Sequence, residues 1–139
     1  MGIFGNLFKK KEVLPPFDLG RFKTDMHSHL IPGIDDGSQS MDQTIAMLSK
    51  FESLGYTKVV TTPHIMSDTF PNNKETIEAG LKEVQKEIKK VGIQIEIEAA
   101  AEYYFDETLM PKIKSKELLT FGDNYVLVEF AFHSSPQYL

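Results

Sequence analysis

The chain has 139 residues, of which 41% are hydrophobic and 25% are charged, and its formal net charge at pH 7 is −5. This balance is typical of a folded domain rather than a disordered tail, and the acidic charge leads us to expect no nucleic-acid partner. Cysteine does not occur in the sequence. Disulfides are therefore excluded, and so is a hydrolase whose nucleophile is a cysteine thiolate.

The N-terminal stretch differs in composition from the rest of the chain. An apolar segment precedes the three lysines at 9–11, and Pro15-Pro16 separates this stretch from the residues after it. A secretory signal has the reverse order of charge and apolar residues, and no segment approaches the roughly 20 apolar residues that span a membrane. We expect a flexible basic tail over residues 1–19, with at most weak membrane contact, and a folded unit over 20–139.

Strand-like and helix-like segments alternate after the tail. Residues 22–27 predict a short strand that ends in a histidine cluster, and residues 32–37 form a loop rich in turn residues. A capping pattern at Ser40 predicts the start of a helix. Its apolar residues recur at helical spacing until Gly55, where we expect the helix to stop.

The middle of the chain repeats this order. Residues 57–62 are rich in β-branched side chains and predict a second strand, which runs into His64. Asn72 with Glu75 predicts the start of a second helix, whose apolar residues form one stripe at steps of three and four. Gly92 is the expected end of this helix.

The last third contains two more predicted strands. Residues 93–98 alternate strictly between apolar and polar side chains, which predicts a third strand that continues to Glu102. A short helix is expected over 106–115, with a kink or an early stop at Pro111. After a turn, residues 125–130 predict a fourth strand.

This order of strands and helices predicts a parallel α/β architecture, in which functional side chains gather at the carboxyl ends of the strands. His27 and His29, His64 and Glu102 fall at three such ends. We therefore expect residues that are scattered in the sequence to converge in space.

The residue types at these ends are those that bind metal ions. His27 and His29 are two residues apart, so in an extended chain both rings point to the same side, about 6.6 Å apart. Asp35-Asp36-Gly37 supplies carboxylates nearby, although the same residues are typical of a plain turn, and both interpretations stay open. Glu102 follows three alanines that leave room at a crowded centre, but an exposed glutamate is the commoner outcome for such a residue.

Two further titratable residues receive no assigned role. Glu129 lies in an apolar strand, either as a charge at the sheet edge or as an inward group beside the site, and His133 is expected in a loop. The sequence has neither a Gly-x-Ser-x-Gly nucleophile elbow nor a Gly-x-x-x-x-Gly-Lys phosphate loop. Mixed histidine and carboxylate donors suit Mn²⁺, Fe or Zn²⁺, so metal-assisted hydrolysis is the predicted chemistry.

Four short motifs occur in order along the chain: Thr-Asp-Met-His-Ser-His at 24–29, Gly-Ile-Asp-Asp-Gly at 33–37, Thr-Thr-Pro-His at 61–64 and Ala-Glu-Tyr-Tyr at 101–104. Together they resemble the polymerase and histidinol phosphatase (PHP) family. Within that family they are similar to the bacterial tyrosine-protein phosphatases associated with capsule and exopolysaccharide synthesis, and so is the run at 118–129. The resemblance covers about residues 20–139.

The resemblance implies the N-terminal part of a distorted (β/α)7 TIM-like barrel with up to three metal ions, often manganese. It implies that His27, His29, Asp36, His64 and Glu102 are metal ligands, with Glu102 bridging two ions. A metal-activated hydroxide would then hydrolyse phosphotyrosine on a bacterial tyrosine kinase that controls polysaccharide export or chain length. The same resemblance implies a cytoplasmic protein.

One departure from the family pattern concerns the end of the chain. Family members continue past residue 139 with a His-Pro-Glu-Arg-like motif and an Asp-x-His-like motif that complete the metal centre, and neither occurs here. We therefore expect a truncated chain with little or no activity of its own. The alternatives are another PHP phosphoesterase, such as one acting on histidinol phosphate, and a non-catalytic fragment that binds metal or a kinase.

Overall fold

The structure is a computed structural model that describes residues 15–131. Most of the predicted basic tail and the predicted loop residue His133 lie outside these residues. The described part contains six short strands and three α-helices, preceded by a 3-10 turn at Leu19–Arg21. Every strand pairing is parallel, so the predicted parallel α/β architecture is confirmed. No helix within 15–131 is long and apolar enough to cross a membrane.

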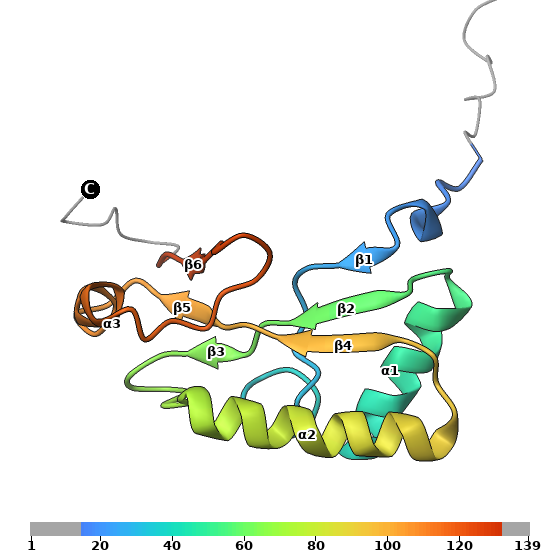
Figure 1. The fold of residues 1–139 in the computed structure, drawn as a ribbon, viewed down its shortest axis with the longest axis horizontal. Coiled ribbons are helices and arrows are strands. Elements are labelled where there is room, and N and C mark those ends of the chain that lie inside the picture. Colours follow the sequence, from blue (N-terminus) through green and yellow to red (C-terminus); the bar gives the residue numbers. More distant parts are fainter. Residues whose placement is uncertain (1–14, 132–139) are drawn as a thin grey trace, which may run out of the picture.

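The first sheet consists of β1 (Thr24–Asp25), β2 (Lys58–Thr61) and β4 (Glu96–Ala99), in the order β1-β2-β4. Helices α1 (Met41–Ser53) and α2 (Lys74–Val91) cover one face of it (Figure 1). The residues between these elements form a largely apolar core. Its buried members are Leu30, Leu48, Val59, Val84, Ile88, Ile93, Ile95 and Ile97.

Both long helices begin at capped residues, one of them later than predicted. Helix α1 starts after Ser40, as predicted from the capping pattern. The prediction that Asn72 starts α2 is wrong by one residue, because Asn73 is the cap. The Asn73 side chain accepts from the Thr76 backbone N–H at 2.9 Å, and the Thr76 hydroxyl oxygen accepts from the Asn73 N–H at 3.0 Å. A threonine thus takes the reciprocal place that a glutamate usually occupies. Gly92 ends the helix at φ 84°, as expected.

The second sheet consists of β3 (His64–Ile65), β5 (Glu102–Tyr104) and β6 (Leu127–Glu129), in the order β3-β5-β6. Helix α3 (Leu109–Ser115) lies beside it (Figure 1). Alternate residues of these strands face opposite sides, so the apolar ones pack with α3 and the polar ones point the other way. The buried apolar set on the α3 side includes Ile65, Tyr103 and Leu109.

One predicted strand is broken in two, and another is followed by a strand that the sequence did not predict. Strand β2 lies within the predicted strand 57–62, and β3 begins after it at His64. The predicted strand from 93 to 102 forms β4 and β5. Backbone bonds still cross the breaks, since Ala100 N donates to the Thr61 carbonyl at 2.9 Å and Glu102 N to the Pro63 carbonyl at 3.1 Å. Pro63 has no backbone N–H to donate, so the regular hydrogen bonding between β2 and β4 ends there. The same two segments pair again as β3 and β5 in the second sheet.

Helix α3 is shorter than predicted and is not broken by its proline. Asp106 accepts from the Thr108 N–H at 2.8 Å, which holds a turn before the helix, and the helix begins at Leu109 instead of residue 106. Pro111 is then the third helical residue, where the N–H has no partner within the helix. The expected early stop is therefore wrong, because the helix continues to Ser115.

Candidate metal centre

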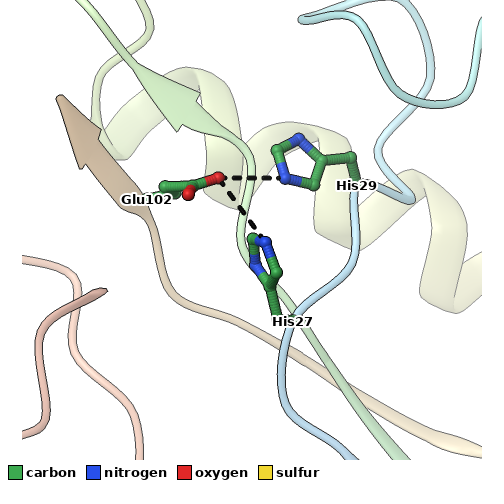
Figure 2. Close-up of side chains that lie close together, drawn as sticks. All are labelled: His27, His29 and Glu102. Atoms are coloured by element: carbon green, nitrogen blue, oxygen red, sulfur yellow. Dashed lines mark ion pairs between the residues drawn. The ribbon is translucent and has the colours of Figure 1, made fainter. Parts of the chain in front are cut away.

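The predicted ligands meet where the first sheet passes into the second. His27 and His29 follow β1, His64 is the first residue of β3, and Glu102 is the first residue of β5. Figure 2 shows the rings of His27 and His29 on the same side of Glu102, each joined by a dashed line to one oxygen of its carboxylate. Backbone pairing places His64 beside Glu102 in register. An open cavity of about 460 Å³ lies over these residues.

One oxygen of Glu102 faces three imidazole rings. Its Oε2 lies 3.8 Å from His27 Nε2, 3.2 Å from His29 Nε2 and 3.5 Å from His64 Nδ1. The residue is 8% exposed, so its charge is almost withdrawn from water. Burying this negative charge lowers the stability of the protein when no cation is bound. The carboxylate and the ring nitrogens together are suited to bind a divalent cation.

The two aspartates of the Asp-Asp-Gly turn have different surroundings. The side chain of Asp36 is 66% exposed, and its Oδ1 lies 3.5 Å from His64 Nε2. The Asp35 side chain is fully buried, and its Oδ2 accepts from His29 Nδ1 at 2.8 Å. Its Oδ1 accepts from the Gly37 N–H at 3.0 Å, which is the bond of a turn. The turn interpretation is therefore confirmed, and the binding of metal by Asp36 stays a prediction.

Neighbouring groups shift the pKa values of His29 and Asp35. The hydrogen bond to Asp35 raises the pKa of His29, and the nearby carboxylates add to this, against the opposing effect of burial. Burial alone would raise the pKa of the Asp35 carboxyl, but hydrogen bonds from His29, Gly37 and His64 outweigh it and lower that pKa. A cation must displace any proton from a histidine that binds it, so its affinity will depend on pH.

Glu129 joins the site, although the sequence left its role undecided. Its Oε2 lies 3.6 Å from His64 Nδ1. Both atoms are buried and have no hydrogen-bond partner within residues 15–131. In the β5–β6 pairing, Tyr104 is opposite Glu129, and residues two apart on a strand share a face, so Glu129 points to the same side as Glu102. This register was the missing information, because the sequence alone does not say how the strands align.

Three overlapping sets of side chains have donor atoms within 4.8 Å of one another. They are His27, His29 and Glu102; His29, Asp36 and His64; and His64, Glu102 and Glu129. All five predicted ligands occur in these sets, while their binding of metal stays a prediction. Nitrogen and carboxylate donors, together with the buried atoms that lack partners, fit borderline divalent cations.

Comparisons with known proteins point to one family. The family model described as "Capsular polysaccharide synthesis, CpsB/CapC" matches residues 23–139. Tyrosine-protein phosphatase CpsB of Streptococcus pneumoniae is 31% identical over 80% of this chain and 46% of its own length. Putative tyrosine-protein phosphatase CapC of Staphylococcus aureus is 30% identical over 82% of this chain and 45% of its own. The chain thus spans about half the length of these curated relatives.

A solved structure shares the fold. It comes from crystal structures of YwqE from Bacillus subtilis and CpsB from Streptococcus pneumoniae, described as unique metal-dependent tyrosine phosphatases. The alignment covers 83% of this chain and 47% of that chain, with a TM-score of 0.75 and 24% identity. At this identity the likeness concerns the fold.

Proposed function

Because this chain belongs to the CpsB/CapC family of capsular polysaccharide synthesis, we propose that the whole protein is a metal-dependent phosphatase that hydrolyses phosphotyrosine. The observation that carries the proposal is the convergence of three histidines on the buried carboxylate of Glu102. Residues 20–139 are proposed to be the N-terminal part of a distorted (β/α)7 barrel of the PHP type. Activity is assigned to the whole protein, since the matched relatives are about twice as long.

The proposed ligands are the five residues named from the sequence, with Glu102 shared between cations, and Glu129 is added to them. The set is His27, His29, Asp36, His64, Glu102 and Glu129. Manganese is the proposed metal, with iron or zinc as alternatives that the same donors accept. A divalent cation held there would supply a nucleophile at neutral pH by lowering the pKa of a coordinated water, and would offset phosphoryl charge.

The chain's own residues limit what can bind in the cavity. Without cations, the carboxylates of Asp36, Glu102 and Glu129 repel a phosphoryl group, so anion binding depends on a metal being present. The cavity is open to solvent, which suits a phosphorylated side chain at the surface of another protein. The proposed substrate is phosphotyrosine on a bacterial tyrosine kinase of capsule synthesis, and the proposed location is the cytoplasm. The names of the matched relatives support the tyrosine substrate.

An assay on the whole natural protein with Mn²⁺ tests this function. A phosphotyrosine peptide and histidinol phosphate are compared as substrates, and we expect faster hydrolysis of the peptide. Glu102→Gln should lower kcat/KM for the peptide at least about 100-fold, because the metals contribute several kcal/mol to transition-state stabilisation. Glu96→Gln is the matched control, since Glu96 is an exposed carboxylate on β4 that pairs with Lys58 at 3.2 Å. Preference for histidinol phosphate, or full activity of Glu102→Gln, would contradict the proposal.

A further inference from the structure

The buried carboxylate of Asp35 accepts hydrogen bonds from three separate places. His29 Nδ1 bonds to Oδ2 at 2.8 Å, and the backbone N–H of His64 bonds to the same oxygen at 3.1 Å. The backbone N–H of Gly37 bonds to Oδ1 at 3.0 Å. Asp35 is not among the residues that line the cavity, whereas His29, Gly37 and His64 are, so Asp35 acts on the site through the residues that line it.

We propose that Asp35 is a positioning residue that fixes which nitrogen of His29 carries the proton. An ionised carboxylate can only accept a hydrogen bond, so the ring must present Nδ1–H to it. The lone pair of Nε2 is then left for a cation, and this nitrogen is the one that faces Glu102, at 3.2 Å. Carboxylates behind metal-binding histidines act in this way in other metal sites. The inference rests on the proposed function, because it assumes that His29 binds metal.

The same carboxylate also joins two ligands from different strands. His29 lies in the segment after β1, whereas His64 begins β3, and Asp35 Oδ2 bonds to both. The loop fits closely against His29, because a Cβ added to Gly37 would lie 2.2 Å from His29 Cβ. Neither histidine can shift relative to the other without breaking a bond to a buried charge, which is costly.

His27 provides an internal comparison within the site. Its Nδ1 lies 2.7 Å from Thr62 Oγ1. A hydroxyl can donate or accept, so Thr62 does not dictate where the His27 ring carries its proton. A change at Asp35 should therefore alter the tautomer of His29 and leave that of His27 as it was.

The test is a long-range ¹H–¹⁵N spectrum of the histidine rings in the metal-free whole protein, at a pH where the rings are neutral. The wild type should show His29 with its proton on Nδ1. In Asp35→Asn the side chain offers one oxygen and one NH₂ group to three donors, so it no longer dictates the proton position. We expect His29 to become a mixture of tautomers and Mn²⁺ affinity to fall about 10- to 100-fold.

Gln39→Ala is the matched control for loop stability. The Gln39 Nε2 donates to the carbonyls of Asp35 and Gly37 at 3.0 and 2.8 Å, so it braces the same loop without touching either histidine. This variant should keep the His29 tautomer and the Mn²⁺ affinity of the wild type.

Three results would overturn the inference. They are a wild-type His29 with its proton on Nε2, an Asp35→Asn protein with unchanged tautomer and affinity, and a Gln39→Ala protein that loses both. The first of these needs no variant, so the inference can be tested even if Asp35→Asn does not fold. Because the spectra need neither metal nor substrate, failure of the proposed phosphatase activity would be seen separately.

Discussion

The two sheets of this molecule differ in what holds them together. The sheet β1-β2-β4 is covered by two long amphipathic helices, and its core residues, such as Leu48 and Val84, are apolar and fully buried. The sheet β3-β5-β6 has strands of two or three residues, packs against the short helix α3 and against Ile77 of α2, and contains His64 and Glu102 as buried titratable groups. The first sheet has the features of a scaffold, and the second contributes His64, Glu102 and Glu129 to the candidate metal site, next to the histidines that follow β1.

This difference indicates that most of the stabilising core lies with the first sheet, whereas the candidate ligands that lie within strands belong to the second. Buried groups without partners, such as Glu129 Oε2, lower the stability of the second sheet until something binds them. Proteins commonly accept such a cost at functional sites. Changes in the apolar core of the first sheet should therefore have the largest effect on unfolding, and changes to the titratable groups of the second sheet should mainly affect ligand binding.

The largest expected effect on stability is in the scaffold. Leu48→Ala should lower the free energy of unfolding by about 2–5 kcal/mol, because it leaves a cavity in the apolar core. Urea denaturation measures this change. Leu54→Ala is the control, because Leu54 caps the end of the same helix and is 39% exposed. It should lower the free energy of unfolding much less than Leu48→Ala does. Equal losses for the two variants would show that the helix-covered core is not the main source of stability.

Metal should stabilise the protein through the second sheet. At a free Mn²⁺ concentration of 100 times Kd, the free energy of unfolding should rise by about 2.7 kcal/mol, because the ion binds the folded state. Hydrogen exchange should show more added protection in β5 than in β4, since Glu102 begins β5. Glu102→Gln should remove most of the gain. A protein whose urea midpoint is the same with and without Mn²⁺ would contradict this division.

A smaller effect is expected from the Tyr103 hydroxyl, which is buried and accepts from the Leu119 N–H at 2.8 Å. Tyr103→Phe leaves that N–H without its acceptor and should cost about 1–2 kcal/mol in urea denaturation. Tyr125→Phe is the matched control, because Tyr125 is 65% exposed. If both variants lose the same free energy of unfolding, the hydrogen bond between Leu119 and Tyr103 does not stabilise the protein.

The smallest effect concerns pH. Burial raises the pKa of the Asp106 carboxyl, but hydrogen bonds from Thr108 and Ser67 outweigh it, so the folded-state pKa is lowered. The resulting stabilisation should be present above the unfolded-state pKa of about 3.9 and should disappear as pH falls through the lower folded-state value. Wild type should therefore exceed Asp106→Asn in stability at pH 7, and the difference should shrink in acid. A constant difference across this range would contradict the lowered pKa.

Much of the fold was predictable because its signals are local. The spacing of apolar residues in α1 and α2, the Ser40 cap and the Gly92 stop all act within a few residues. The resemblance to capsule-associated tyrosine phosphatases, drawn from four short motifs, is confirmed by the family match to residues 23–139. Four of the five predicted ligands could be grouped because parallel strands bring their carboxyl ends together, and Asp36 was added through the family resemblance.

The features that were missed depend on contacts between distant segments. The strand breaks at Pro63 and Ala100 arise where the pairing passes from one sheet to the other. The role of Glu129 follows from the alignment of β6 with β5, which no local pattern specifies. Asn72, predicted as a helix cap, instead donates to the carbonyls of Ile34 and His64 at 2.8 and 2.9 Å, so it connects two parts of the site.

The central claim is that side chains from separate strands hold shared cations, and equilibrium dialysis of the whole protein against Mn²⁺ tests it most directly. Single alanine replacements of His27, which follows β1, and His64, which begins β3, should each lower both the amount of Mn²⁺ bound and its affinity. Binding curves that match the wild type for both variants would show that these strands do not share a metal centre.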